Sequence, residues 1–186
     1  MIVILSGVSG AGKDTIKRIL MGKDGRIKTL PSYTTRDKRI NEVEGENYYY
    51  VSKEKFKEMI DNNEFYEYSV HHGNYYGTNK KLLNERIKNN IVLKDIDVNG
   101  TEDLLKIFRG TEIKIISIFL NISKEEMLRR LENRDDKLKQ EEIELRMNRY
   151  DYEMNHIGIY DYVIKNYDAE KNTPFQKYTP ILVRYC

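Results

Sequence analysis

The sequence predicts an α/β fold with a parallel sheet, and two observations carry that prediction. Short apolar runs alternate with segments of helical character along most of the 186 residues. A glycine-rich loop that ends in lysine, residues 7–13, stands between the first apolar run and the first of these helices. A chain of this length is expected to form a single domain, residues 1–186, with one sizeable core.

The elements of this pattern can be placed in order along the chain. The apolar runs expected to form strands are residues 2–5, 91–97, 113–120 and 161–164. Helices are expected near residues 14–21, 53–61, 80–89, 100–108 and 140–156. A further helix is expected after Ser123, because Ser123 and Glu126 form a capping box that satisfies free N–H groups at a helix start.

Two segments interrupt the alternation. Residues 32–76 are crowded with Tyr, Arg and Gly, and the stretches NYYYV and FYEYSV alternate in the manner of antiparallel strands. We expect an inserted binding subdomain there, with the core in residues 1–31 and 77–186. Residues 133–145 are highly charged and are interpreted equally well as a solvated connection or as a lid that closes over a ligand.

The composition excludes several classes of partner. The net charge is only +2, and the charges are interspersed without a basic stripe, so polymeric nucleic acid is not expected as a partner. The apolar run at residues 2–5 is too short to span a bilayer and leads into glycines rather than a cleavage site, so we expect a cytoplasmic protein without a membrane partner. The single cysteine, Cys186, fits a reducing compartment. No pattern indicates an oligomeric state.

The loop after the first strand has the spacing of a phosphate-binding loop. Gly7, Gly12 and Lys13 match the first three fixed positions of G-x-x-x-x-G-K-[ST]. The glycines let backbone N–H groups converge on phosphate oxygens, and the lysine reaches the β- and γ-phosphates of a nucleoside triphosphate. The residues expected to contact that nucleotide are Gly7, Ser9, Gly10, Ala11, Gly12, Lys13, Asp14 and Thr15.

Asp14 departs from the motif, because it stands where a hydroxyl normally binds Mg²⁺. A carboxylate is a hard oxygen ligand that suits Mg²⁺, although it also adds a negative charge beside the phosphates. Thr15 lies about 100° further around the helix and cannot take the same place. We therefore hypothesise that Asp14 binds Mg²⁺ directly or through water.

A second acidic pair, Asp95 and Asp97, closes the expected strand 91–97 at the edge of the sheet where ligands bind. Side chains two residues apart in a strand point the same way. The pair either caps the strand, contacts a second substrate, or supports the metal, with Asp95 acting through water. His71 and His72 are adjacent without convergent partners, which favours a turn or surface role over a metal site.

The order and spacing of the motifs resemble those of guanylate kinases over residues 1–168. The motifs that carry the resemblance are GVSGAGK, SYTTRDKR, NNEFYEY, HGNYYGT, KDIDVNG and YDYVIKN. The resemblance implies a P-loop nucleoside monophosphate kinase fold with a core, a GMP-binding region and a lid. It also implies ATP- and Mg²⁺-dependent phosphorylation of GMP and dGMP.

The resemblance assigns roles to residues of the insertion and the C-terminal half. By position, the GMP phosphate would meet Arg36, Arg39, Tyr48 and Tyr76, while guanine would meet Ser32, Glu67, Thr78 and Asp97. A carboxylate such as Glu67 can accept from both N1–H and the N2 amine of guanine, a donor pair that adenine lacks. On the ATP side, Lys13, Arg134 and Arg146 would be catalytic, and Asn166 would lie near the adenine.

Two other functions remain open at this point. A lysine followed by Asp and then Ser or Thr also resembles ribose bisphosphate kinases, which phosphorylate a sugar phosphate; the guanine-directed residues argue against that reading. The chain also resembles the catalytically silent guanylate-kinase-like modules of membrane-associated scaffolds. The retained Gly12, Lys13 and lid arginines disfavour a silent module.

Overall fold

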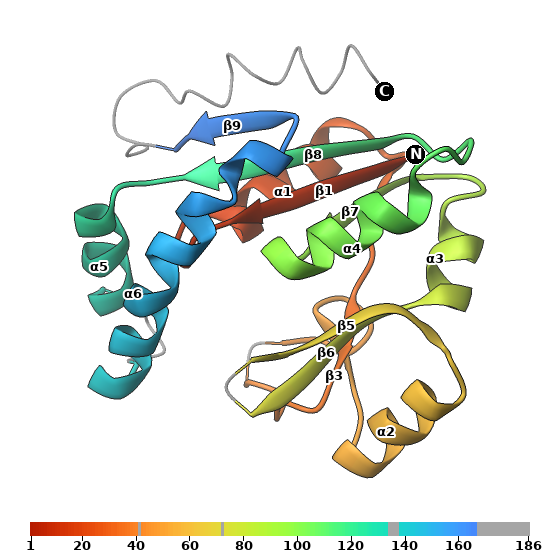
Figure 1. Ribbon diagram of the computed structural model, residues 1–186, viewed down its shortest axis with the longest axis horizontal. Helices are drawn as coiled ribbons and strands as arrows, with labels where there is room; N and C mark the ends of the chain where they lie inside the picture. Colours follow the sequence, from red (N-terminus) through yellow and green to blue (C-terminus); the bar gives the residue numbers. More distant parts are fainter. Residues whose placement is uncertain (41, 72, 134–137, 167–186) are drawn as a thin grey trace. The chain divides into compact units, whose positions relative to one another are not determined.

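The computed structural model describes residues 1–40, 42–71, 73–133 and 138–166 (Figure 1). The chain divides into two compact units. Unit 1 contains residues 1–4 and 17–116, and unit 2 contains residues 5–16 and 117–186. The elements mix a parallel sheet with helices, so the predicted α/β class is confirmed.

Five strands form the parallel sheet, in the order β2-β7-β1-β8-β9. They are β1 (Ile2–Gly7), β2 (Ile27–Thr29), β7 (Ile91–Asp95), β8 (Ile115–Asn121) and β9 (Tyr162–Lys165). β2 pairs in parallel with β7 in unit 1, and β8 pairs in parallel with β9 in unit 2. The four predicted strands are present, because runs buried on both faces read as continuous apolar stretches. Sequence patterns did not predict β2, which is only three residues long.

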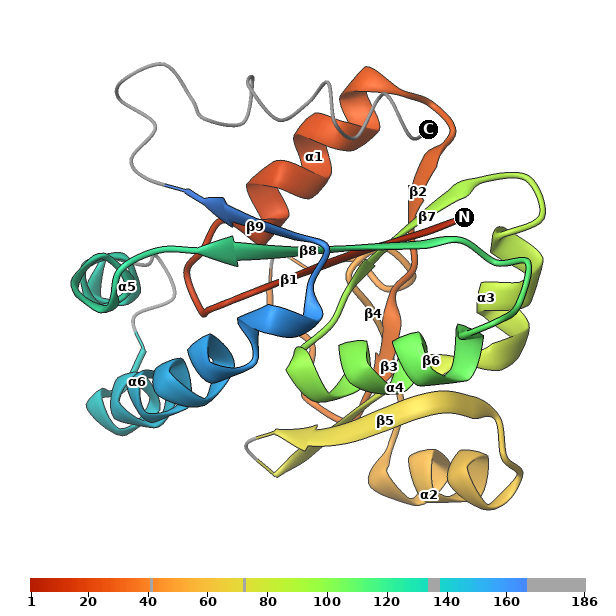
Figure 2. The same ribbon diagram turned by 45° about the horizontal axis from the view of Figure 1, so that its top comes forward.

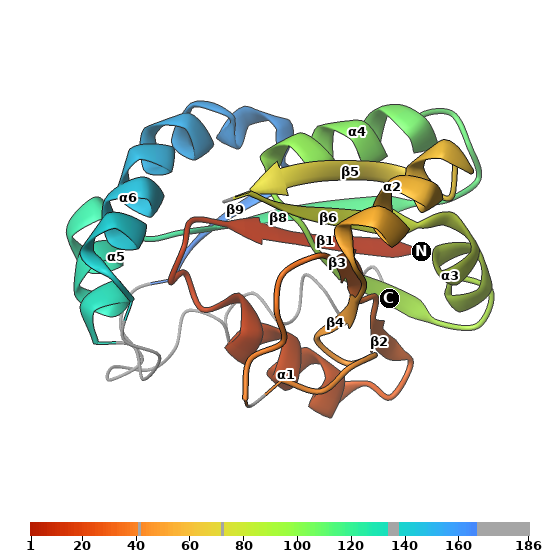
Figure 3. The same ribbon diagram turned by 90° about the horizontal axis from the view of Figure 1, so that it is seen from below.

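The six α-helices of the described residues all lie where the sequence predicts them. They are α1 (Lys13–Lys23), α2 (Lys53–Asp61), α3 (Lys80–Arg86), α4 (Val98–Phe108), α5 (Lys124–Glu132) and α6 (Gln140–Asn155), followed by a short 3-10 turn at Ile157–Ile159. The Ser123 half of the predicted capping box of α5 is confirmed, since Ser123 Oγ accepts from the Glu126 N–H at 3.2 Å, whereas the Glu126 carboxylate binds Arg129 and Arg130. α5 and α6 lie side by side in unit 2 (Figure 3).

A second sheet of four strands lies within unit 1, in the order β4-β3-β6-β5. Its strands are β3 (Ser32–Thr34), β4 (Tyr48–Tyr50), β5 (Phe65–His71) and β6 (Asn74–Asn79). β5 and β6 form an antiparallel hairpin, as predicted for FYEYSV. The antiparallel prediction for NYYYV was wrong, because β4 pairs in parallel with β3. The long connection of residues 35–47 returns the chain to the same end of the sheet, as parallel pairing requires.

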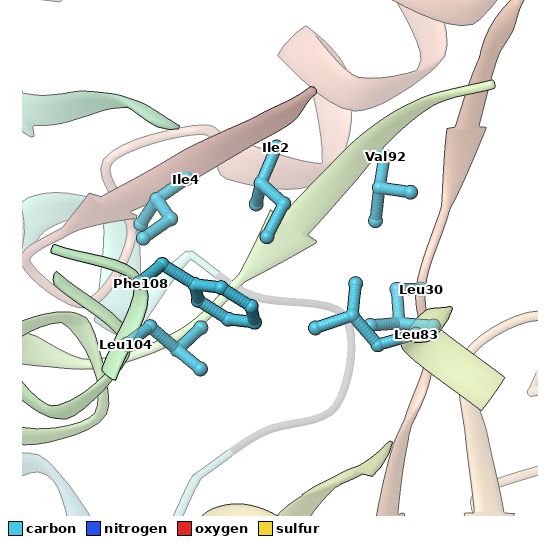
Figure 4. Close-up of a cluster of buried hydrophobic side chains, with 7 residues drawn as sticks. All are labelled: Ile2, Ile4, Leu30, Leu83, Val92, Leu104 and Phe108. Atoms are coloured by element: carbon cyan, nitrogen blue, oxygen red, sulfur yellow. The ribbon is translucent and has the colours of Figure 1, made fainter. Parts of the chain in front are cut away.

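Unit 1 has two hydrophobic clusters. The larger one joins β1, β7, α3 and α4 and contains Ile2, Ile4, Leu30, Leu83, Val92, Leu104 and Phe108 (Figure 4). The smaller one, Phe56, Met59 and Phe65, packs α2 against the second sheet, beside which α2 is seen in Figure 2. Among the described residues, no helix is both long and apolar enough to cross a bilayer.

Candidate functional site

Glycines shape the loop between β1 and α1 in unit 2. Gly7, Gly10 and Gly12 have φ of +148°, +76° and +90°, a region that side chains disfavour. A Cβ on Gly7 would lie 2.4 Å from the Leu120 carbonyl oxygen, and one on Gly12 would lie 2.8 Å from Asn166 Nδ2. Only glycine fits these two positions, because the loop main chain packs closely against Leu120 and Asn166.

Lys13 begins α1 and folds back over the loop. Its Nζ donates to the carbonyl oxygens of Gly7 at 2.8 Å and Val8 at 3.4 Å. Arg146, on α6, also reaches the loop, since its Nη1 donates to Ser9 Oγ at 3.0 Å. The structure therefore brings two of the three predicted catalytic residues to the glycine loop. Arg134 lies outside the described residues.

Arg130 and Asn166 hold the other side of the loop. Asn166 Nδ2 donates to the Ala11 carbonyl at 2.7 Å. Arg130 donates to the carbonyl oxygens of Gly10 and Asn166, each at 3.1 Å. Sequence patterns did not single out Arg130.

Glu126 anchors this arginine. It accepts hydrogen bonds from both Arg129, at 2.8 Å, and Arg130. The hydrogen bonds from Arg129, with those from Arg130, outweigh desolvation and lower the pKa of Glu126 to about 2. The carboxylate is therefore ionised at neutral pH and keeps Arg130 oriented toward the loop.

The predicted metal ligand Asp14 lies exposed in the first turn of α1, with Thr15 beside it, also exposed. A carboxylate at this end of a helix faces the positive end of the helix dipole. The described residues contain no group of three His, Cys, Asp or Glu side chains that could hold a metal ion. A Mg²⁺ ion here would fit the usual arrangement of one carboxylate, phosphate oxygens and water.

A buried polar cluster lies in unit 1 where the second sheet meets β7 and α4. Glu67 on β5 stands opposite Thr78 on β6, and the Thr78 hydroxyl donates to Glu67 Oε1. Glu67 is only 6% exposed, and burial raises its pKa against the opposing charge of Lys94 and the bond from Thr78. Gly100 on α4 permits this close packing, because a Cβ there would lie 3.0 Å from Glu67 Oε2.

Lys94, on β7, lies beneath the same cluster and was not predicted as a site residue. Its Nζ donates to Ser32 Oγ at 2.6 Å and to the Leu30 carbonyl at 3.3 Å. Burial lowers the pKa of Lys94 to about 8, and the negative charges of Glu67 and Asp95 oppose that change. The run IVLKDID reads as a strand, and no feature of it marks this lysine as buried.

The residues proposed for a phosphate monoester gather around Arg36. Its Cζ lies 5.2 Å from the Tyr48 ring centroid, and the rings of Tyr48 and Tyr76 are 5.9 Å apart. Glu42, which the sequence reading missed, accepts from Arg36 at 2.6 Å and from the N–H of Arg39 at 2.9 Å. Burial raises the pKa of Tyr48 far above its usual value, so its phenol remains a donor.

Asp95 and Asp97 have different surroundings, contrary to the alternation argument. β7 ends at Asp95, which pairs with Lys17 Nζ at 3.0 Å. Asp97 lies beyond the strand and caps α4, accepting from the Gly100 N–H at 2.9 Å. Its other oxygen is 2.8 Å from His71 Nε2. His71 is thus a strand residue in contact with a predicted substrate ligand rather than an isolated surface side chain; His72 lies outside the described residues.

Comparisons with known proteins agree on one family over nearly the whole chain. The family model described as Guanylate kinase matches residues 1–176. A guanylate kinase of Prochlorococcus marinus (strain MIT 9312) is 40% identical over 172 residues, which are 91% of each chain. One of Bartonella henselae is 40% identical over 179 residues, covering 94% of this chain and 77% of that one. The crystal structure of guanylate kinase from Anaplasma phagocytophilum aligns with a TM-score of 0.73 at 30% identity, covering 100% of this chain and 85% of that chain.

Proposed function

The chain belongs to the guanylate kinase family, and we propose on that basis that it transfers the γ-phosphoryl group of ATP to GMP or dGMP, giving ADP and GDP or dGDP. The observation that carries the choice of acceptor is the buried carboxylate of Glu67, supported by the Thr78 hydroxyl. An ionised carboxylate has about four lone-pair sites, so Glu67 can still accept from N1–H and N2–H of guanine. AMP would leave a buried acceptor unpaired, which disfavours it.

The roles proposed for the other substrate residues follow from their chemistry. Arg36, Arg39, Tyr48 and Tyr76 would hold the phosphate of GMP by charge-assisted hydrogen bonds. Ser32 and Asp97 would face the base with Glu67 and Thr78. Glu42 already compensates the charge of Arg36. A dianionic phosphate would therefore share this guanidinium with Glu42 and would not bind an uncompensated positive charge.

Catalysis in this proposal depends on positioning and charge. The loop N–H groups, with Lys13, would hold the phosphates of ATP, and the positive φ values of Gly7, Gly10 and Gly12 support such a main-chain cradle. Arg146 and Arg134 would stabilise negative charge on the transferring phosphoryl group. Asn166 would border the adenine. No strong base is needed, because phosphoryl transfer passes through a loose transition state.

Magnesium would be held by Asp14, directly or through water, together with phosphate oxygens. Asp95, which Lys17 already binds, would act at most through water. Asp14→Ser should reduce Mg²⁺-dependent activity and raise the Mg²⁺ concentration for half-maximal rate more than Thr15→Ala does. Equal effects of the two substitutions would remove Asp14 from the metal site.

A coupled assay of ADP release tests the proposal and its alternatives together. ATP and Mg²⁺ are offered with GMP, dGMP, AMP, UMP, ribose 1-phosphate or ribose 1,5-bisphosphate. Saturable turnover restricted to GMP and dGMP supports the proposal. Preference for a ribose phosphate would instead indicate a sugar-phosphate kinase, and tight GMP binding without turnover a silent module. None of the comparisons favours either alternative.

A cytoplasmic location remains a prediction.

A further inference from the structure

The charge of Lys94 has no part in the chemistry described so far, and its position is unusual for a lysine. The residue is 1% exposed and is the penultimate residue of the core strand β7. Lysine is almost never fully buried unless it is paired, because removing an ammonium group from water is costly. An apolar side chain of similar length would fill the same space, so packing alone does not account for a lysine here.

The hydrogen bond from Lys94 to Ser32 influences whether the Ser32 hydroxyl donates or accepts in a second hydrogen bond, to a ligand. An ammonium group has three donors and no acceptor, so Ser32 Oγ must accept at the 2.6 Å contact. A serine hydroxyl has one proton, which must then point elsewhere. Across the residues that the structure describes, no side chain or carbonyl accepts that proton. The bond from Lys94 occupies one of the two lone pairs of Ser32 Oγ and leaves its proton available, so the hydroxyl favours donation to a ligand.

Purines differ at position 6 in whether the exocyclic group accepts or donates a hydrogen bond. Guanine and hypoxanthine carry an oxo group, which accepts, whereas adenine and 2,6-diaminopurine carry an amine, which donates. A freely rotating hydroxyl serves either group, whereas one with a lone pair already occupied by Lys94 donates more readily than it accepts and so favours the oxo group. We propose that Lys94 is a positioning residue that fixes Ser32 as a hydrogen-bond donor and so selects 6-oxopurine nucleotides. This inference rests on the proposed function, in which Ser32 faces the base.

The same buried cation also supports the acceptor side of the cluster. Lys94 is the main positive charge acting on Glu67, and it favours the ionised carboxylate. One lysine thereby stabilises a donor at Ser32 and an acceptor at Glu67, the two properties that complement the O6 and the N1–N2 edge of guanine. The two buried charges also compensate each other, which reduces the cost of burying either one.

The test compares three acceptor nucleotides in the Lys94→Met variant of the full chain. GMP has O6, N1–H and the N2 amine, IMP keeps O6 and N1–H, and 2,6-diaminopurine ribonucleoside monophosphate keeps only the N2 amine. We expect kcat/KM to fall about tenfold for GMP and for IMP, mainly through KM, because a charge-assisted bond network is lost. The diaminopurine nucleotide lacks the oxo group and should lose several-fold less than GMP and IMP, and KM for ATP should not change.

Two further variants identify the route of the effect. Ser32→Ala should give the same selective loss for GMP and IMP. The double variant should lose less than the product of the two single losses, because part of the effect of Lys94 passes through that hydroxyl. Lys81→Met removes an exposed lysine of the same unit and is the matched control. If Lys94→Met loses its cooperative thermal transition, Lys94→Gln replaces it; an amide both donates and accepts, so the loss should remain selective for 6-oxopurines.

The outcomes separate the inference from the proposed function. Equal losses for all three nucleotides, no loss for GMP, or losses that multiply in the double variant would overturn the role of Lys94 while leaving GMP phosphorylation intact. A wild-type chain that does not phosphorylate GMP would instead overturn the proposed function.

Discussion

The loop of residues 7–13 in unit 2 and the Glu67 cluster in unit 1 differ in which atoms face a ligand. In the loop, main-chain groups form the surface, and Lys13 and Asn166 bind carbonyl oxygens of the loop itself. In the cluster, the side chains of Ser32, Glu67 and Thr78 provide the polar atoms. A main-chain site depends on the sequence chiefly through its glycines, whereas a side-chain site depends on every donor, acceptor and charge.

This difference predicts what each site loses on substitution. Damage to the loop should weaken all reactions of the enzyme equally, since every reaction uses the same triphosphate. Damage to the cluster should change which acceptor is used. The predictions below can break or refine that distinction, and they run from the largest expected effect to the smallest.

Replacing Lys13 by Met should have the largest effect. We expect kcat/KM to fall on the order of 10² to 10³-fold for every acceptor nucleotide, because a charge that stabilises the transferring phosphoryl group is removed. The assay is steady-state ADP release with GMP and with dGMP. Lys23→Met, at the exposed end of the same helix, is the control and should be neutral. A loss confined to one acceptor would contradict the distinction between the sites.

Replacing Glu67 by Gln should lower kcat/KM for GMP on the order of 10²-fold while changing the low activity with AMP far less. The amide keeps the shape of the carboxylate, but part of it donates toward groups that also donate. Parallel measurements with GMP and AMP give the ratio. Glu58→Gln, an exposed partner of Lys55, is the control. Equal losses for GMP and AMP would remove Glu67 from base recognition.

Replacing Gly12 by Ala tests the main-chain cradle. The added Cβ would meet Asn166 Nδ2 at 2.8 Å in a backbone conformation with φ of +90°. We expect KM for ATP to rise about tenfold while KM for GMP changes little. Gly22→Ala has open space around it in α1 and should instead raise the free energy of unfolding by up to about 1 kcal/mol. An unchanged KM for ATP in Gly12→Ala would argue against a phosphate cradle.

Replacing Glu126 by Gln should destabilise the chain by about 1 kcal/mol at pH 7, the smallest effect considered. Its pKa is about 2 in the folded chain and roughly 4.3 when unfolded, so the ionised form stabilises folding above the unfolded value. That contribution is lost as the pH falls toward 2. Urea unfolding at several pH values should therefore show the difference from wild type narrowing below about pH 4. Glu132→Gln, at the exposed end of α5, should cause no such loss.

The fold could be predicted from the sequence where the pattern is local. Buried strands such as β1 and β8 read as apolar runs, and Ser123 marks the start of α5 by its own side chain. The pairing of β4 could not be read, because its neighbour β3 has only three residues and the connection between them determines the direction. Strand length, not hydrophobicity, limited the prediction there.

The candidate site divides in the same way. The glycine and lysine spacing predicted the loop, and the resemblance supplied the residues proposed for the second substrate. The sequence patterns did not predict a role for Lys94, Glu42 or Arg130, because each contacts another protein group and has no fixed spacing to a motif. Their importance lies in contacts between residues far apart in the chain, which neither periodicity nor composition records.

The small cluster of Phe56, Met59 and Phe65 gives the second sheet hydrophobic support that is separate from the residues beneath the parallel sheet. Substitutions within this small cluster therefore act on the packing of α2 and do not directly touch the residues packed around β1 and β7. During evolution, the proposed acceptor site can therefore change through substitutions around one small apolar cluster, while the residues proposed to bind the triphosphate stay the same.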